Sequence, residues 1–144
     1  KCITEPHLIL HELDKKIIAT LQKQNFNQND GMDMVILVIE ERDDHSKFVH
    51  WAGAKNPLYY VQDGKIHEIK GDKFAVGGNQ LKHTKVFNTH TFPLHEGDIY
   101  YLFSDGFQDQ FGGAENKKFM VKKFRNLLGE INNLPMSEQK ERLD

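Results

Sequence analysis

The stretch LYYVQDGKIHEI, residues 58–69, places two short segments rich in aromatic and β-branched residues on either side of Asp63-Gly64. Asp-Gly is typical of a two-residue turn between antiparallel strands, because both positions accept the positive φ that this turn requires. Other strand-like segments are MVILVI at 34–39, KFVHWAG, TKVFNTHTFPL and EGDIYYLFS. The middle of the chain therefore favours hairpins over a parallel, doubly wound sheet. MVILVI, an unbroken apolar run, is interpreted as a strand buried on both faces.

Helical patterns flank this strand-rich region. Apolar residues at steps of three and four predict an amphipathic helix over residues 4–23, with Thr4 at its N-cap. A second helix is predicted over residues 118–131, and MSEQKERL predicts a third that starts at Ser137. Helices on both sides of antiparallel hairpins predict an α+β domain.

Length and composition limit the classes of function. The chain has 144 residues, the size of one ordinary domain, and its 19 basic residues nearly balance 21 acidic ones. No strong field therefore favours nucleic acid or an anionic membrane as a partner. The longest apolar runs are too short to cross a bilayer, so we expect no direct membrane insertion. The single cysteine excludes an internal disulfide and fits a reducing compartment. We expect a cytoplasmic location, although the parent protein could be tethered to a membrane.

Several residues suggest catalysis but lack the spacing it requires. His7 and His11 are four residues apart without the intervening Glu of a zincin helix, and are interpreted as solvated helix residues. Ser104 does not lie in a Gly-x-Ser-x-Gly elbow. GDKFAVGG matches neither a P-loop nor a dinucleotide fingerprint and is interpreted as a loop. A basic cluster could bind phosphate or an acidic partner but is interpreted as a solvated helix face. The cluster consists of Lys117, Lys118, Lys122, Lys123 and Arg125.

The stretch SDGFQDQFGG follows directly on the apolar run DIYYLF and carries two carboxylates and three glycines. An Asp-Gly pair after a strand can be a tight turn, in which Asp bonds its own backbone and Gly takes a positive φ. It can also be a metal loop, because hard divalent cations bind carboxylate oxygens that are held on a rigid support. The turn is the commoner of the two, and the residues alone leave both interpretations open.

Four segments together resemble the SpoIIE-type serine phosphatase domain, the bacterial branch of the metal-dependent type 2C protein phosphatases. They are DGMDMVILVIE, WAGAKNPLYYVQDGKIHEIKGDKFAVGG, GDIYYLFSDGFQDQFGG and KKFMVKKFRNLLGEI. The resemblance runs in order over nearly the whole chain, so residues 1–144 are interpreted as a single partial domain. It implies an antiparallel β-sandwich flanked by helices. It also implies hydrolysis of phosphoserine or phosphothreonine on a partner protein in bacterial partner-switching signalling, often an anti-sigma-factor antagonist.

The same resemblance implies roles for three residues of SDGFQDQFGG. Asp105 would be a ligand in a centre of two bridged Mn or Mg ions, and Gly106 would leave room for the ion and its waters. Asp109 would help to hold a more weakly bound additional ion. Two cations that activate a bridging water make a protein nucleophile unnecessary, so Ser104 would be structural. No residue is assigned to substrate binding.

The sequence departs from the family pattern at both ends. The family carries an earlier Asp followed by a Gly-His-Gly-type turn, and a late Asp-Asp pair; neither occurs here. We therefore expect a fragment that binds metal weakly and is inactive by itself, cut from a protein with an upstream sensor or regulatory domain. The alternative is a non-catalytic module that binds a phosphoprotein or dimerises on the same scaffold. Strand edges exposed by the missing segments favour a homodimer.

Overall fold

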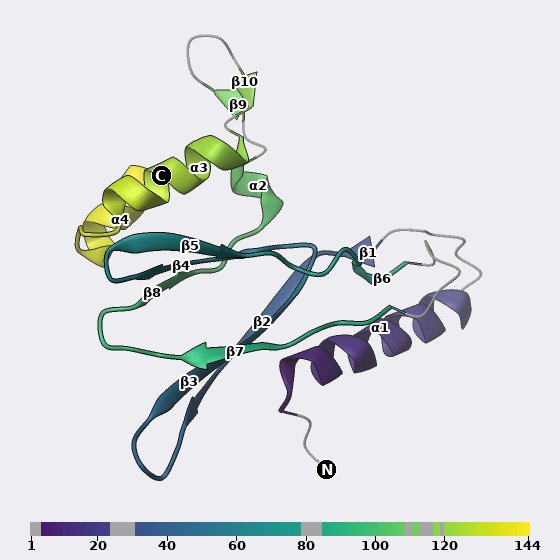
Figure 1. The fold of residues 1–144 in the computed structure, drawn as a ribbon. Helices are drawn as coiled ribbons and strands as arrows, with labels where there is room; N and C mark the ends of the chain where they lie inside the picture. The colour runs from purple at the N-terminus through teal and green to yellow at the C-terminus, as the bar shows by residue number, and fades with distance from the viewer. Residues whose placement is uncertain (1–3, 24–30, 79–84, 109–110, 113–116, 119) are drawn as a thin grey trace. The chain divides into compact units, whose positions relative to one another are not determined.

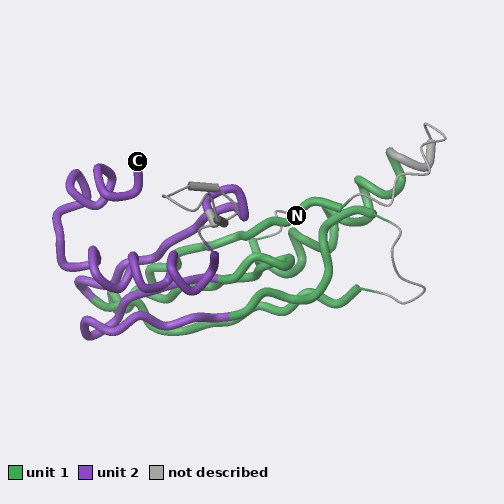
Figure 2. Tube along the Cα trace, turned by 90° about the horizontal axis from the view of Figure 1, so that it is seen from above, with its two compact units in different colours: residues 1–57, 70–95 green, residues 58–69, 96–144 purple. Residues whose placement is uncertain are grey.

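A computed structural model describes residues 4–23, 31–78, 85–108, 111–112, 117–118 and 120–144 of the chain. The chain forms two compact units, Lys1–Pro57 with Lys70–His95 and Leu58–Ile69 with Glu96–Asp144 (Figure 2). Each unit has its own antiparallel sheet and its own helices (Figure 1), which confirms the α+β class. That residues 1–144 form a single partial domain, and that the two sheets form a sandwich, remain predictions. No helix within these described ranges is long and apolar enough to cross a lipid bilayer.

The sheet of the first unit has the strand order β2-β3-β7 and is antiparallel throughout. Its strands are β2 (Met34–Glu41), β3 (Lys47–Ala54) and β7 (His90–Pro93). The strand predicted over 34–39 is confirmed, but its burial on both faces is wrong: β2 is half-buried, and Ile39 is 57% exposed. The reason is its place at the sheet edge, where within the described residues it pairs only with β3.

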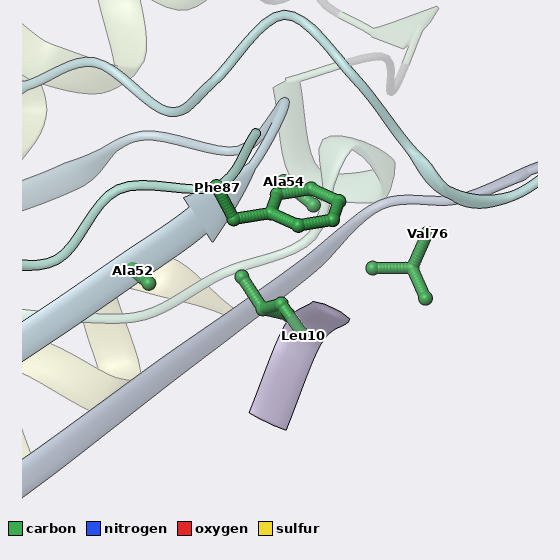
Figure 3. Close-up of a cluster of buried hydrophobic side chains, with 5 residues drawn as sticks. All are labelled: Leu10, Ala52, Ala54, Val76 and Phe87. Carbon is green, nitrogen blue, oxygen red and sulfur yellow. The ribbon is translucent and has the colours of Figure 1, made fainter. Parts of the chain in front are cut away.

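Helix α1 (Pro6–Lys23) packs its apolar side on this sheet. The buried cluster, shown in Figure 3, consists of Leu10, Ala52, Ala54, Val76 and Phe87. The short strands β1 (Gly31–Met32) and β6 (Val76–Gly77) pair beside it, so GDKFAVGG is not entirely a loop. Gly77 has φ 74°, and a Cβ there would come within 2.7 Å of Ile17 Cγ2. Close packing of α1 on β6 therefore requires glycine at this position.

The N-terminus of α1 is capped by a residue from a distant part of the chain. The helix begins at Pro6, two residues after the predicted N-cap Thr4. Thr89 Oγ1 accepts the His7 backbone N–H at 3.1 Å and lies 2.8 Å from His7 Nδ1. The solvated interpretation is wrong for His11, whose Nδ1 is buried and whose ring meets Phe87 edge-on at 6.3 Å.

The segment TKVFNTHTFPL forms a strand only over His90–Pro93. Before that strand, Phe87 is buried in the core, whereas Val86 is 59% exposed. Irregular backbone lets Phe87 reach the core and Thr89 reach α1, which explains why the rest of this strand-like segment does not continue the strand.

The sheet of the second unit has the strand order β5-β4-β8. Its strands are β4 (Leu58–Gln62), β5 (Lys65–Ile69) and β8 (Ile99–Tyr101). The predicted hairpin is confirmed: Asp63 and Gly64 join β4 to β5 with φ 51° and 69°, the two positive values that this turn requires.

Helices α3 (Val121–Ile131) and α4 (Met136–Leu143) lie along one face of this sheet (Figure 1). The predicted helix start at 118 is wrong, because Lys117–Lys118 form strand β10, which pairs with β9 (Phe111–Gly112). Helix α4 begins one residue before Ser137. The buried side chains between helices and sheet are Tyr59, Phe124, Leu128 and Ile131.

Two tyrosines of this core allow a matched test of buried hydroxyl groups. Tyr59 is fully buried, and its hydroxyl has no hydrogen-bond partner within the described part of the chain. Tyr101 donates its hydroxyl to Gln139 Oε1 at 2.9 Å. We expect Tyr59→Phe to leave the free energy of unfolding unchanged or to raise it by up to about 1 kcal/mol, and Tyr101→Phe to lower it by about 1 kcal/mol. Urea denaturation measures the free energy of unfolding of both variants. Equal losses in the two variants would contradict the difference in hydrogen bonding between Tyr59 and Tyr101.

Burial also raises the pKa of three tyrosines in this unit, Tyr59, Tyr100 and Tyr101, above the ordinary value of 10.0. The shift is largest for Tyr100, whose hydroxyl also donates a hydrogen bond to Asp98. The folded chain therefore keeps phenol protons that the unfolded chain releases near pH 10, so the free energy of unfolding should fall as pH rises above about 10. Tyr100→Phe should flatten this decline relative to the unsubstituted protein. Urea midpoints of both proteins, measured between pH 9 and pH 11, test this prediction. If the midpoints of both proteins fell equally with pH, the prediction would be wrong.

Candidate functional site

Asp105 lies where an apolar strand ends. Strand β8 stops at Tyr101, and Asp105 is the first residue of the short helix α2 (Asp105–Gln108). The Asp105 side chain is exposed, and within the described residues it makes no hydrogen bond or ion pair. A carboxylate presented in this way is open to a ligand from solution.

The backbone at Asp105-Gly106 does not form a tight turn with glycine at positive φ. A tight turn with glycine at positive φ would place Gly106 in the left-handed region, but its φ is not positive. The pair opens a helical turn instead. Among the described residues, a Cβ at Gly106 would meet only Ser104 Oγ, at 3.4 Å, which is ordinary van der Waals contact. Neither the backbone nor a described neighbour therefore requires glycine at position 106.

Asp109, the other residue predicted to bind metal, lies outside the described residues. Among the described residues, no three His, Cys, Asp or Glu side chains are grouped as a metal site would need. Hard divalent cations take six or more oxygen ligands, and the exposed Asp105 carboxylate fits as one of them. The roles of Asp105, Asp109 and Gly106 in metal binding stay predictions.

The residues around Asp105 are held by the core of the second unit. Phe103 and Phe107 are partly buried and pack against the cluster that contains Tyr59 and Phe124. Nothing in the spacing of SDGFQD indicated this anchoring. The available signal was the pair Phe103 and Phe107, one on each side of Asp105 and each two positions away from it.

Two residues of the basic cluster, Lys122 and Arg125, border an open groove of about 530 Å³ between α3 and β5. Its lining includes Lys122, Arg125 and the carboxylate of Glu130, over a floor of Ile66 and Gly129. Arg125 also lies 3.5 Å from Glu68 Oε2. Because charges of both signs line the groove, its electrostatics favour no single class of ligand, and the exposed Lys122 and Lys123 agree with a solvated helix face.

A second polar cluster lies on the sheet of the first unit. His50 Nε2 is 3.0 Å from Glu40 Oε2, and His50 Nδ1 is 3.0 Å from Thr91 Oγ1. The hydrogen bond from His50 holds the pKa of the Glu40 carboxyl below its ordinary value. The three side chains come from β3, β2 and β7, so they form a cross-strand ladder, which is consistent with His50 as an ordinary sheet residue.

Comparisons with known proteins were made on the sequence and on the fold. The family model of Stage II sporulation protein E (SpoIIE) matches residues 2–143. The solved SiaA-PP2C domain of Pseudomonas aeruginosa is similar to 96% of the chain, with a TM-score of 0.78 and 29% sequence identity. The chain spans about half of that structure's length, 51%. Curated protein sequences gave no significant match.

Proposed function

The chain belongs to the SpoIIE family, and from this premise we propose that it is part of a Mn- or Mg-dependent protein serine/threonine phosphatase. The observation that carries the proposal is the exposed Asp105 carboxylate at the end of β8. The similarity of the chain's fold to a PP2C domain supports the same metal-dependent phosphatase chemistry. The exposed position also suits a phosphorylated side chain on another protein, which could not enter a deep, closed pocket.

In this proposal Asp105 holds a divalent ion, and Gly106 leaves space for the ion and its waters. Asp109 contributes to an additional, weaker site. Bound Mn or Mg would lower the pKa of a water and neutralise phosphoryl oxygens. Asp105 therefore acts by binding and orienting, and Ser104, next to it, stays structural.

The substrate we propose is phosphoserine or phosphothreonine on a bacterial signalling protein of the partner-switching type, such as an anti-sigma-factor antagonist. An upstream sensor or regulatory domain would control it, and the reaction would take place in the cytoplasm. Family membership supports these assignments.

The second candidate is a non-catalytic module that binds a phosphoprotein or forms a homodimer. One observation favours it: β2 lies at the edge of its three-stranded sheet, and its Ile39 is exposed. An exposed strand edge can pair with a second chain. Light scattering at micromolar concentration tests the homodimer, and a mass of one chain would contradict it.

Hydrolysis of a phosphoserine peptide by the full-length protein separates the two candidates. We expect hydrolysis that requires Mn or Mg and stops on addition of a chelator. The 144-residue chain alone should bind either ion weakly and show no useful turnover. Metal-independent hydrolysis would contradict the metal site, and absence of hydrolysis by metal-loaded full-length protein would favour the non-catalytic module.

A further inference from the structure

Two aromatic side chains bracket Asp105, Phe103 two residues before it and Phe107 two residues after it. The Phe103 ring stacks on Tyr59 with centroids 5.2 Å apart and meets Phe124 edge-on at 4.8 Å. The Phe107 ring lies 4.8 Å from the same Phe124. These separations are in the range at which aromatic rings attract one another. Both sides of the Asp105 segment are thus attached to one residue of α3.

The anchor residue Phe124 is buried in the core, whereas the attached segment has few contacts of its own. Phe124 is 3% exposed and lies in the core between α3 and the β5-β4-β8 sheet. Helix α2 has four residues, too few to be stable without tertiary contacts. Asp105 itself makes no hydrogen bond within the described residues that would fix its carboxylate. The contacts of Phe103 and Phe107 therefore hold the segment in place.

We propose that Phe103 and Phe107 are positioning residues, which fix the Asp105 carboxylate for metal binding by attaching the segment on both sides of it to Phe124. This inference rests on the proposed function, since it assigns Asp105 as a ligand. A metal ligand must be held within about 0.5 Å of its productive position. Without one of the two aromatic anchors, the segment would have to lose conformational entropy when the ion binds, and affinity would fall.

The test is Mn²⁺ affinity, measured by titration calorimetry on the full-length protein, together with the melting temperature. Phe107→Ala should weaken Mn²⁺ binding by about tenfold or more, the size of effect seen when the partners that orient a metal ligand are removed. Phe107→Leu keeps an apolar side chain that can contact Phe124, so it should restore much of the Mn²⁺ affinity. If Phe107→Ala does not fold, the affinity of Phe107→Leu is compared directly with that of the unsubstituted protein. The matched control is Leu143→Ala, which removes an α4 side chain from the same core cluster.

Leu143→Ala should lower the melting temperature but change Mn²⁺ affinity less than about twofold. Unchanged affinity in both Phe107 variants, or an equal loss in Leu143→Ala, would overturn the positioning role. Asp105→Asn separates this result from the proposed function. If Asp105→Asn weakens Mn²⁺ binding and the Phe107 variants do not, only the positioning inference fails; if Asp105→Asn has no effect, the assigned metal site is wrong.

Discussion

Asp105→Asn in the full-length protein should abolish most of the metal-dependent hydrolysis of a phosphoserine peptide. The substitution keeps the size and shape of the side chain but removes the negative charge that would face the cation. One carboxylate at a bridged cation site is worth several kcal/mol of transition-state stabilisation, so kcat/KM should fall by about a thousandfold. Asp109→Asn should have a smaller effect at saturating metal, because its expected ion is more weakly bound.

A control for loss of surface charge is Glu138→Gln, an exposed carboxylate in the first turn of α4. It should leave kcat/KM unchanged. If the full-length protein kept its activity with Asp105→Asn, the metal assignment of SDGFQD would be wrong. The helical turn that Asp105 opens would then be structural only.

Lys85→Met should cause the largest loss of stability in the first unit. Lys85 Nζ lies 2.7 Å from Asp14 Oδ1 and donates to the backbone carbonyls of Ala75, Gly77 and Gly78. Asp14 also accepts the Gly77 N–H at 2.8 Å, and both charged residues are buried. Removing the lysine leaves a buried carboxylate without its cation, which costs about 3–5 kcal/mol. That is a large fraction of the 5–15 kcal/mol typical of a folded domain.

Trp51, the chain's single tryptophan, lies in the core of the first unit, so its fluorescence during urea denaturation reports on this unit. The matched control is Lys15→Met, which removes a lysine of α1 whose partner Glu12 is exposed. Because solvent screens that pair, its loss should leave the urea midpoint nearly unchanged. A Lys85→Met midpoint no lower than that of Lys15→Met would contradict a stabilising role for the buried pair.

Local sequence determined the elements whose stability is local. Asp63-Gly64 specifies its hairpin, because few other residue pairs accept two positive φ values at low cost. The apolar period of α1 specifies a helix because it matches the helical repeat, and the β-branched residues in the apolar run of β2 favour a strand. The resemblance of four ordered segments to the SpoIIE-type domain indicated the family, and the match over residues 2–143 confirms it.

Tertiary structure decided the contacts between residues far apart in the chain. Thr89 caps α1 across 82 residues, and Lys85 reaches Asp14 across 71, so neither pairing leaves a periodic signal near either partner. Phe107 likewise meets Phe124 of α3, with ring centroids 4.8 Å apart, and the aromatic residue alone did not indicate that partner. Periodicity shows which side of an element is apolar. Which distant side chain meets it depends on how the whole chain packs, because burial and hydrogen bonding are satisfied by any partner that the fold brings near.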